Sequence, residues 1–304
     1  MKILALVLAG GKGSRLYPLT AEHAKPAIPF AGGHRIVDFV LSNLVNSGIT
    51  SIYVLAQYKP QSLIEHIRVA WTPADRGLDR FVSVVVPGAD SVREPFRGTA
   101  DAVYRSLHLC ARHAPDLVAV FAADHVYRMD VGQMVEAHAQ SKADISVAAV
   151  PVPVGRASPF GIIATHADGR IREFQEKPER PAPIPERPSH AYASMGNYLF
   201  DPGVLAALLD QAARRGETDF GRHVLPRATA THRVFAYDFT GNRVPGILAH
   251  EEPHYWRDLG TIEAYRAAQR DAWGPRPKFN LANQRWPTGG GLRAAVAERV
   301  AASN

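Results

Sequence analysis

Residues 3–15 read ILALVLAGGKGSR, a run of seven apolar residues that ends in a glycine-rich loop. An apolar run of this length, without alternating polar positions, predicts a strand buried on both faces of a parallel sheet. Because Gly10, Gly11 and Gly13 lack a Cβ atom, their backbone N–H groups can turn toward an anion. Arg15 adds a full positive charge. The stretch therefore predicts a phosphate-binding loop at the carboxyl end of a central strand.

The glycine spacing excludes two common kinds of phosphate loop. Residues 10–15 follow the pattern G-G-x-G-x-R, whereas a Walker loop has Lys and then Ser or Thr after its second glycine. The dinucleotide fingerprint G-x-G-x-x-G is not met either. Kinase and NAD-dependent functions therefore lose their main support, and a loop that merely turns the chain is the remaining structural alternative.

Composition limits the classes of protein to consider. The 304 residues are 46% hydrophobic, enough for one large α/β domain, and the single cysteine, Cys110, excludes an intramolecular disulfide. The amino-terminal apolar run is too short for a signal peptide or a membrane span, so we expect a cytoplasmic protein without a membrane partner. The basic residues behind the formal net charge of +6 are spread along the chain, which favours anionic small molecules over a nucleic-acid partner.

Strand and helix signals alternate along the first half of the chain. Strands are predicted at residues 3–9, 52–56, 81–86 and 117–122, and helices at 36–46, 63–70 and 99–113, the last with Thr99 as its N-cap. The alternation predicts an α/β fold with a doubly wound, mostly parallel, Rossmann-like sheet and helices on both faces. Ligands of such folds bind beyond the carboxyl ends of the strands, where the glycine loop and Asp124 can face one site.

The pattern of apolar residues changes after residue 150. Short apolar stretches at 162–163, 171–174 and 192–200 are separated by Pro and Gly, which predicts a mixed or antiparallel extension. Residues 178–188 contain five prolines and are predicted to form an extended surface loop.

Several motifs resemble one known family. LYPLT at residues 16–20, AKPA at 24–27 and RIVDF at 35–39 follow the glycine loop in the order seen in the sugar-1-phosphate nucleotidyltransferases. Within them the chain is most similar to the glucose-1-phosphate adenylyltransferases, or ADP-glucose pyrophosphorylases, of bacterial glycogen synthesis, from Ile3 to about Pro287. The resemblance implies that ATP and α-D-glucose 1-phosphate are converted to ADP-glucose and diphosphate with Mg²⁺. The same fold using UTP or dTTP, and a noncatalytic regulatory homologue, are the alternatives.

The resemblance also implies roles for individual residues. The expected catalytic residues are Arg15, Asp124 and Lys177, and the expected metal ligands are Asp124 and Asp258. The expected nucleotide-binding residues are Gly10, Gly11, Gly13, Lys25, Gln57, Gly98 and Thr99. The expected glucose-1-phosphate-binding residues are Phe96, Gly161, Glu176, Lys177 and Ser194. Without the resemblance, Asp124 and Asp258 would be read as helix caps near Asp130 and Thr261, and Glu176–Lys177 as an exposed ion pair.

The sequence departs from the family in three places. Phe96 stands where a tyrosine is usual, and Glu22 and His23 replace basic residues that answer anionic effectors in some bacterial members, so regulation does not carry over. We expect no counterpart of the family's C-terminal β-helix, because residues 289–291 are glycines and 292–303 predict one short amphipathic helix. We therefore expect a catalytic domain at 1–278, a connection remnant with a helical tail at 279–304, weak or absent activation by sugar phosphates, and homo-oligomers, if any, smaller than a tetramer.

Overall fold

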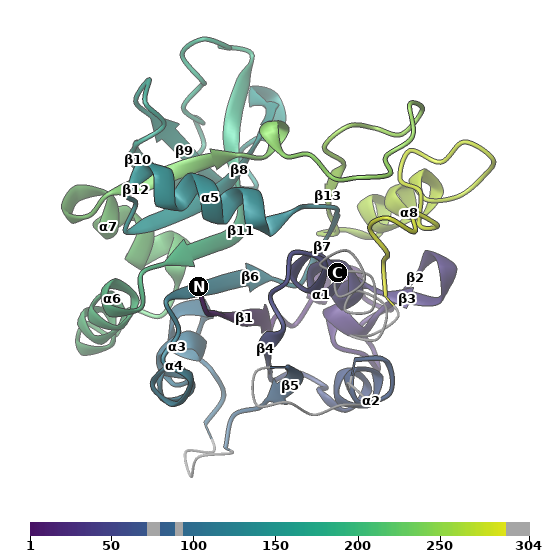
Figure 1. Cartoon of the computed structure of the whole chain (residues 1–304), viewed down its shortest axis with the longest axis horizontal. Helices are drawn as coiled ribbons and strands as arrows, with labels where there is room; N and C mark the ends of the chain where they lie inside the picture. Colours follow the sequence, from purple (N-terminus) through teal and green to yellow (C-terminus); the bar gives the residue numbers. More distant parts are fainter. Residues whose placement is uncertain (72–79, 89–93, 290–304) are drawn as a thin grey trace, which may run out of the picture. The chain divides into compact units, whose positions relative to one another are not determined.

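A computed structural model describes residues 1–71, 80–88 and 94–289 (Figure 1). The chain forms two compact units, each built from separate segments. Unit 1 consists of Met1–Leu4, Phe96–Phe121 and Gly132–Asn242, and unit 2 of Ala5–Pro95, Ala122–Val131 and Arg243–Asn304. The predicted helix at 292–303 lies outside the described residues.

Unit 2 contains the glycine loop and the sheet strands that lead into it. Its strands are β1 (Ile3–Ala9, of which Ile3 and Leu4 belong to unit 1), β2 (Pro29–Phe30), β3 (His34–Arg35), β4 (Ser51–Ala56), β5 (Phe81–Val85), β7 (His125–Tyr127) and β13 (Trp256–Asp258). Its helices are α1 (Ile36–Asn46), α2 (Gln61–Ala70) and α8 (Ile262–Asp271). The sheet order is β1-β4-β5 with β4 and β5 parallel, and two small antiparallel ribbons, β2-β3 and β7-β13, stand apart from that sheet.

Helix α1 supports one of these ribbons. It begins at Ile36, where the Asp38 carboxylate accepts a hydrogen bond from the Arg35 N–H at 2.7 Å, and Gly48 with φ of 83° follows its end. Asn43 on this helix donates to the Tyr127 carbonyl and accepts from the Met129 N–H. The Asn43 side chain therefore fixes the backbone at Tyr127, where β7 ends, and at Met129, two residues later.

Unit 1 contains the extension that was predicted after residue 150 to be mixed or antiparallel, and its strand pairs are of both kinds. Its strands are β6 (Leu117–Ala122, whose last residue belongs to unit 2), β8 (Ile145–Pro153), β9 (Gly161–Thr165), β10 (Ile171–Glu176), β11 (His190–Phe200) and β12 (Val234–Asp238). Their order is β10-β9-β11-β6, and β8 pairs with both β11 and β12. Its helices are α3 (Thr99–Tyr104), α4 (Leu107–His113), α5 (Val131–Ser141, starting in unit 2), α6 (Pro202–Arg214), α7 (Leu225–Thr231) and a π-helical turn, η5 (Phe220–Val224).

The single helix predicted at 99–113 is wrong, because the structure has two helices there. The Ser106 N–H bonds to the Val103 carbonyl and its hydroxyl donates to the Ala102 carbonyl, which ends α3 before α4 begins. Thr99 is also not the N-cap. The first amides of α3, those of Ala100 and Asp101, donate instead to the Thr218 carbonyl, at 2.8 and 3.2 Å.

The predicted α/β class is confirmed: the central sheet is mixed and mostly parallel, with helices packed against it. The strands predicted at 3–9 and 117–122 and the helix predicted at 36–46 have the predicted bounds. Among the described residues, no helix is long and apolar enough to cross a membrane.

Candidate active site

The glycine loop after β1 packs against the stem of Lys25. Gly13 has a left-handed φ of 62°, and a Cβ atom there would lie 3.0 Å from both the Lys25 Cβ and the Thr20 Cγ2. The Gly13 carbonyl accepts hydrogen bonds from the Leu16 N–H and the Thr20 hydroxyl. This position therefore requires glycine for two reasons, its backbone angle and the close approach of Lys25.

Gln57, which follows β4, fixes the start of the loop. Its amide nitrogen donates to the Gly10 carbonyl at 3.2 Å, which leaves its buried Oε1 without a hydrogen-bond partner among the described residues. Apart from Gly11 itself and its two chain neighbours, no described residue has an atom within 4 Å of where a Cβ atom on Gly11 would be. The Lys12 ammonium lies 5.1 Å from the centroid of the Tyr58 ring. The loop thus has an anchored first residue and open space beside its second.

Asp124 lies beside the carboxyl end of β1, as the strand pattern predicted. The Ala123 N–H donates to the Leu8 carbonyl at 3.1 Å, which ties the residue before Asp124 to β1. Asp124 directly precedes β7, and the antiparallel register of β7 and β13 places Asp258 opposite His125. Paired residues in such a ribbon have neighbouring side chains. The ribbon therefore brings two carboxylates together from positions 134 residues apart in the sequence.

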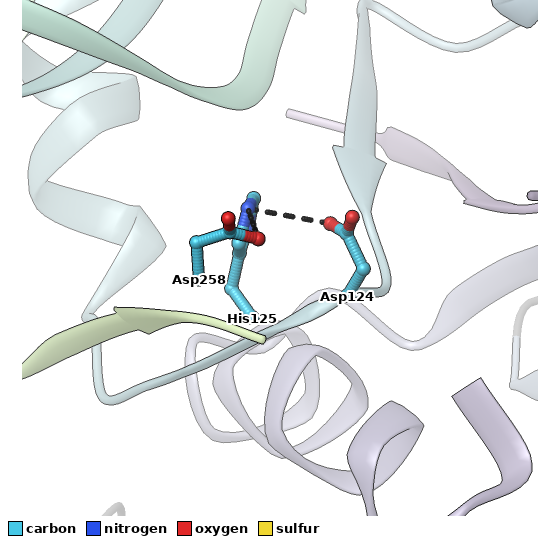
Figure 2. A group of neighbouring side chains, drawn as sticks. All are labelled: Asp124, His125 and Asp258. Carbon is cyan, nitrogen blue, oxygen red and sulfur yellow. Dashed lines mark ion pairs between the residues drawn. The ribbon is translucent and has the colours of Figure 1, made fainter. Parts of the chain in front are cut away.

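Asp124, His125 and Asp258 point toward one another, and their ligand atoms all lie within 4.8 Å (Figure 2). The His125 Nε2 lies 3.3 Å from the Asp124 Oδ1 and 3.7 Å from the Asp258 Oδ1. The Lys25 ammonium donates to the Asp124 Oδ2 at 3.1 Å and lies 3.9 Å from the Asp258 Oδ1. Lys25 therefore stands between the two carboxylates that the sequence predicted as metal ligands.

The charges of this cluster favour an ionised Asp124. Burial opposes ionisation of the carboxyl, but the neighbouring His125 ring and Lys25 ammonium outweigh it and hold the pKa of Asp124 below its usual range. The Asp124 Oδ1 and the His125 Nδ1 are buried and have no hydrogen-bond partner among the described residues. Buried carboxylate oxygens are costly to leave unsatisfied, so this atom is suited to accept a cation or a donor from a ligand.

Arg15 reaches the same cluster past Gly260. A Cβ atom on Gly260 would lie 2.6 Å from the Asp258 Oδ2 and 3.6 Å from an Arg15 guanidinium nitrogen. Glycine at position 260 therefore leaves space for the side chains of both Asp258 and Arg15. Asp258 is not a helix cap, since α8 is capped by the Thr261 hydroxyl, which accepts from the Ala264 N–H at 3.1 Å.

The donor set fits a divalent cation. Two carboxylates and an imidazole converge, and one carboxylate oxygen lacks a partner among the described residues. Carboxylate oxygens suit hard cations such as Mg²⁺ and Mn²⁺, which often keep several water ligands and use one or two protein carboxylates. Nucleotidyl transferases generally use a divalent metal, and this cluster has ligand atoms close enough together to hold one.

A second cluster of predicted residues lies in unit 1, around the Glu176 carboxylate. Glu176 pairs with Gly161 across β10 and β9, and a Cβ atom on Gly161 would lie 3.1 Å from its Oε2. A Cβ atom on Gly221 would lie only 2.6 Å from the same oxygen. Glycines at the first residue of β9 and in η5 thus leave space for this carboxylate.

Asp219 connects η5 with the start of α3. Its Oδ2 accepts a hydrogen bond from the Thr99 hydroxyl at 3.1 Å, and its Oδ1 accepts from the Arg222 N–H at 3.0 Å. The Thr99 Oγ1 in turn accepts from the Phe220 N–H. Gly98 packs closely there, since a Cβ atom on it would lie 2.3 Å from the Thr218 carbonyl oxygen. Gly98 and Thr99 therefore attach the start of α3 to η5 and the residues just before it, through close packing and hydrogen bonds.

The remaining predicted residues of unit 1 differ in exposure. The Lys177 side chain is 56% exposed, and its ammonium lies 3.2 Å from the Glu176 Oε1. Ser194 lies on β11, and its hydroxyl accepts from the Gly196 N–H at the irregular step of that strand. Phe96 is buried, with the Arg105 guanidinium 4.9 Å from its ring centroid. Lys177 is thus the freely accessible charge of this cluster.

Three residues of these clusters were not predicted from the sequence. His125 follows Asp124 directly, so its place in a strand next to a carboxylate was the available signal. The Trp256 ring packs against the His125 ring, with 5.1 Å between their centroids. Asp219 precedes Phe220 and Gly221, and this short pattern does not by itself predict a site. Their roles depend on contacts between residues far apart in sequence.

The chain belongs to the nucleotidyl transferase family, whose model matches residues 4–273. The match covers the glycine loop, both clusters and the β7-β13 ribbon.

Within that family the chain is one of the glucose-1-phosphate adenylyltransferases. It is 52% identical over 287 residues to glucose-1-phosphate adenylyltransferase of Thermodesulfovibrio yellowstonii, and 50% identical over 295 residues to that of Thermus thermophilus. Glucose-1-phosphate adenylyltransferase 1 of Vibrio cholerae is 41% identical over 288 residues. Each comparison covers 94% of this chain and 70% of the relative.

Proposed function

We propose that this protein transfers the adenylyl group of ATP to α-D-glucose 1-phosphate, giving ADP-glucose and diphosphate for the synthesis of glycogen or a related α-glucan. The observation that carries the proposal is the convergence of Asp124, Asp258, Lys25 and Arg15 beside the glycine loop. All reactants are anionic, so the protein must supply cations and hold the reacting groups in line. This set of charges meets that requirement.

The glycine loop and its neighbours are proposed to bind ATP. The N–H groups of Gly10, Gly11 and Gly13 would face the triphosphate, with the Arg15 guanidinium and the Lys25 ammonium as fixed charges. The buried Gln57 Oε1 is an acceptor without a partner among the described residues, and the exocyclic amino group of adenine is a donor that would satisfy it. For Gly98 and Thr99, which lie in unit 1, a role in nucleotide binding is proposed from the family resemblance alone.

Mg²⁺ is proposed as the cofactor, held by Asp124 and Asp258. When bound, it would supply positive charge for the triphosphate oxygens. The chain's own contribution is to keep Asp124 ionised, through His125 and Lys25, and to present both carboxylates from a paired ribbon. Lys25 would neutralise part of the carboxylate charge and offer its ammonium to the phosphates.

The Glu176 cluster is proposed to bind glucose 1-phosphate. Lys177 would hold the phosphate as a point charge, Glu176 would accept hydrogen bonds from sugar hydroxyls, and Gly161 and Ser194 would make close contacts. Phe96 would contribute packing only. In the reaction a phosphate oxygen of glucose 1-phosphate attacks the α-phosphorus of ATP, the new P–O bond forms, and the bond to the leaving diphosphate breaks.

Release of pyrophosphate tests the proposal directly. Purified protein is assayed with Mg²⁺, glucose 1-phosphate and each nucleoside triphosphate separately, and ADP-glucose is identified by mass spectrometry. The expected result is pyrophosphate release with ATP well above that with UTP or dTTP. Preference for UTP or dTTP would support the alternative sugar nucleotide enzyme, and no release with any triphosphate would support a noncatalytic homologue.

A further inference from the structure

The ribbon that carries His125 and Asp258 has two arginines on or beside it. Arg257 is the middle residue of β13, and Arg128 directly follows β7. Because successive side chains of a strand point to opposite faces, Arg257 points away from the face on which Trp256 and Asp258 lie. The two guanidinium groups are therefore candidates for holding the ribbon from its other side.

Two aromatic rings connect these arginines. The Arg128 guanidinium lies 4.4 Å from the centroid of the Phe279 ring, and the Arg257 guanidinium lies 4.2 Å from that of Tyr255. The two rings lie 4.7 Å apart with an interplanar angle of 36°. Together the four side chains form a continuous stack, cation, ring, ring, cation, which we call the arginine–aromatic stack. Both rings are more than nine-tenths buried, a setting in which cation–π attraction is strongest.

Two adjacent glutamates fix the ends of the stack. Glu251 accepts from the Arg128 guanidinium at 3.1 Å and from the N–H groups of Leu248 and Asn280, both at 2.8 Å. Glu252 accepts two hydrogen bonds from the Arg257 guanidinium in a bidentate pair. One two-residue segment therefore binds one arginine at each strand of the ribbon.

A third acid completes the arrangement around Arg257. The Asp271 carboxylate, at the end of α8, accepts from the Arg257 Nε at 3.2 Å and from the Tyr255 hydroxyl at 3.3 Å. All the nitrogen atoms of this guanidinium thus have a carboxylate or carbonyl partner. A planar group held at every nitrogen has one orientation available to it.

Stability alone is a poor explanation for these charges. The Arg128–Glu251 pair is buried, and buried ion pairs are often no more stabilising than apolar side chains of similar volume, because desolvation offsets their attraction. The Arg257–Glu252 pair is partly exposed, and exposed ion pairs contribute little to stability. What they do provide is a single geometry, since each pair is satisfied only when both partners are in place. The arginines, the acids and the rings all lie on or beside the β7-β13 ribbon, which has three residues in each strand. One of these residues is Asp258.

We propose that the arginine–aromatic stack is a positioning device, which sets the placement of β7 against β13 and so the spacing of Asp258 and His125. Arg128, Arg257, Tyr255 and Phe279 are positioning residues and touch no substrate. The inference rests on the proposed function to the extent that Asp258 is taken as a metal ligand. Groups that orient metal ligands typically matter by 10- to 100-fold in metal affinity or activity.

Two matched pairs of variants test the stack. Tyr255→Phe keeps the ring and loses the hydroxyl, whereas Tyr255→Leu loses the ring. Arg257→Lys keeps the charge, whereas Arg257→Met loses both the charge and the bidentate pair but keeps similar length. Ile145→Ala, in the buried start of β8 in unit 1, is the control for a general loss of stability.

The main measurement is Mn²⁺ binding by titration calorimetry without substrates, on the full chain, with melting temperatures measured alongside. We expect Tyr255→Leu and Arg257→Met to weaken Mn²⁺ binding by about 10-fold or more. We expect Tyr255→Phe to bind like the parent protein, Arg257→Lys to recover part of the loss, and Ile145→Ala to melt earlier with unchanged Mn²⁺ affinity.

The kinetic pattern separates positioning from general damage. Tyr255→Leu and Arg257→Met should lower kcat and raise the Mg²⁺ concentration for half activation, with the KM for glucose 1-phosphate nearly unchanged. Mn²⁺ affinity that stays at the parent value in both variants would overturn the inference. Failure of the proposed function would look different: the parent protein would bind Mn²⁺, and lose it on Tyr255→Leu, yet release no pyrophosphate with any triphosphate.

Discussion

Asp124 shows how neighbouring charges keep a half-buried carboxyl ionised. The Lys25 ammonium and the His125 ring lie within 3.3 Å of its two oxygens, and together they outweigh the cost of burial and lower its pKa. An ionised carboxylate with a free lone pair is what a divalent cation requires. Because Lys25 and His125 both contact this carboxylate, we expect the site to lose function when Asp124 loses its charge.

Asp124→Asn is predicted to lower kcat by roughly 10²-fold or more, the scale lost when one preorganised electrostatic contact is removed. The amide has nearly the same volume, so the protein should still fold. Pyrophosphate release measures the rate, and circular dichroism checks the fold. Asp168→Asn, in an exposed turn, is the control and should keep full activity. Near-parent turnover of Asp124→Asn would remove this residue from the mechanism.

Lys177 is the accessible charge of the glucose-1-phosphate cluster, and Lys177→Ala should raise the KM for glucose 1-phosphate much more than that for ATP. The reason is that its charge is proposed to face only one of the two substrates. Lys142→Ala is a close control, because both lysines have a left-handed backbone, with φ of 50° and 48°. Equal increases of both KM values in Lys177→Ala would contradict the assignment.

At the scale of elements, local patterns predicted most strands and helices well. The run at 3–9 and the helix at 36–46 have the predicted bounds because each is buried by its own residues and ended by glycine. The break within 99–113 was not predictable in this way. Its first turn is held by the Thr218 carbonyl, more than a hundred residues later, and such a tertiary contact overrides the capping preference of Thr99.

The contact between α3 and η5 leads to a prediction about stability. Gly98→Ala would place a Cβ atom 2.3 Å from the Thr218 carbonyl oxygen, so the backbone must move and lengthen the hydrogen bonds from Ala100 and Asp101. We expect a loss of about 1–3 kcal/mol in the free energy of unfolding, measured by urea denaturation.

Gly241→Ala is the matched control for this substitution. Apart from Gly241 itself, its two chain neighbours and the backbone of its own helical turn, no described residue has an atom within 4 Å of a Cβ atom on Gly241, and the φ of Gly241 is not left-handed. The control should unfold at the urea concentration of the parent protein. Equal midpoints for Gly98→Ala and Gly241→Ala would mean that the start of α3 can shift without cost.

At the scale of the whole molecule, the candidate site was predictable where residues are close in sequence and less so elsewhere. The glycine loop and the Asp124 strand end followed from the strand pattern, and Asp258 from the family resemblance. Its pairing with His125 follows from the register of β7 and β13, two short strands far apart in the chain. Three-residue strands carry too few side chains for a periodic pattern, so their pairing was not visible in the sequence.

Stability of the whole molecule should fall as the solution is acidified, and His138 is one cause. Its ring lies between α5 and β8, bonded to the Ser146 hydroxyl at 2.8 Å. Burial lowers the pKa of His138, and the nearby Asp201 and Asp144 carboxylates only partly oppose this. The unfolded chain titrates near the ordinary value of about 6.5.

The sign of the effect follows from which state binds the proton first. Well above pH 6.5 both states hold a neutral His138 and its contribution to stability is complete. As the pH falls through about 6.5, the unfolded chain takes up the proton while the folded protein does not, so the free energy of unfolding decreases until the lowered folded pKa is reached. The affected range therefore lies from about pH 6.5 downward.

We predict that His138→Asn removes this part of the pH dependence. The amide of the substituted side chain can still bond the Ser146 hydroxyl but does not titrate, so between about pH 7.5 and 5.0 the variant should lose less stability than the parent protein. Urea denaturation at each pH measures the difference, and His166→Asn, in a loop, is the control. Parallel stability curves for the parent protein and His138→Asn would show that protonation of this ring is not resisted by the fold.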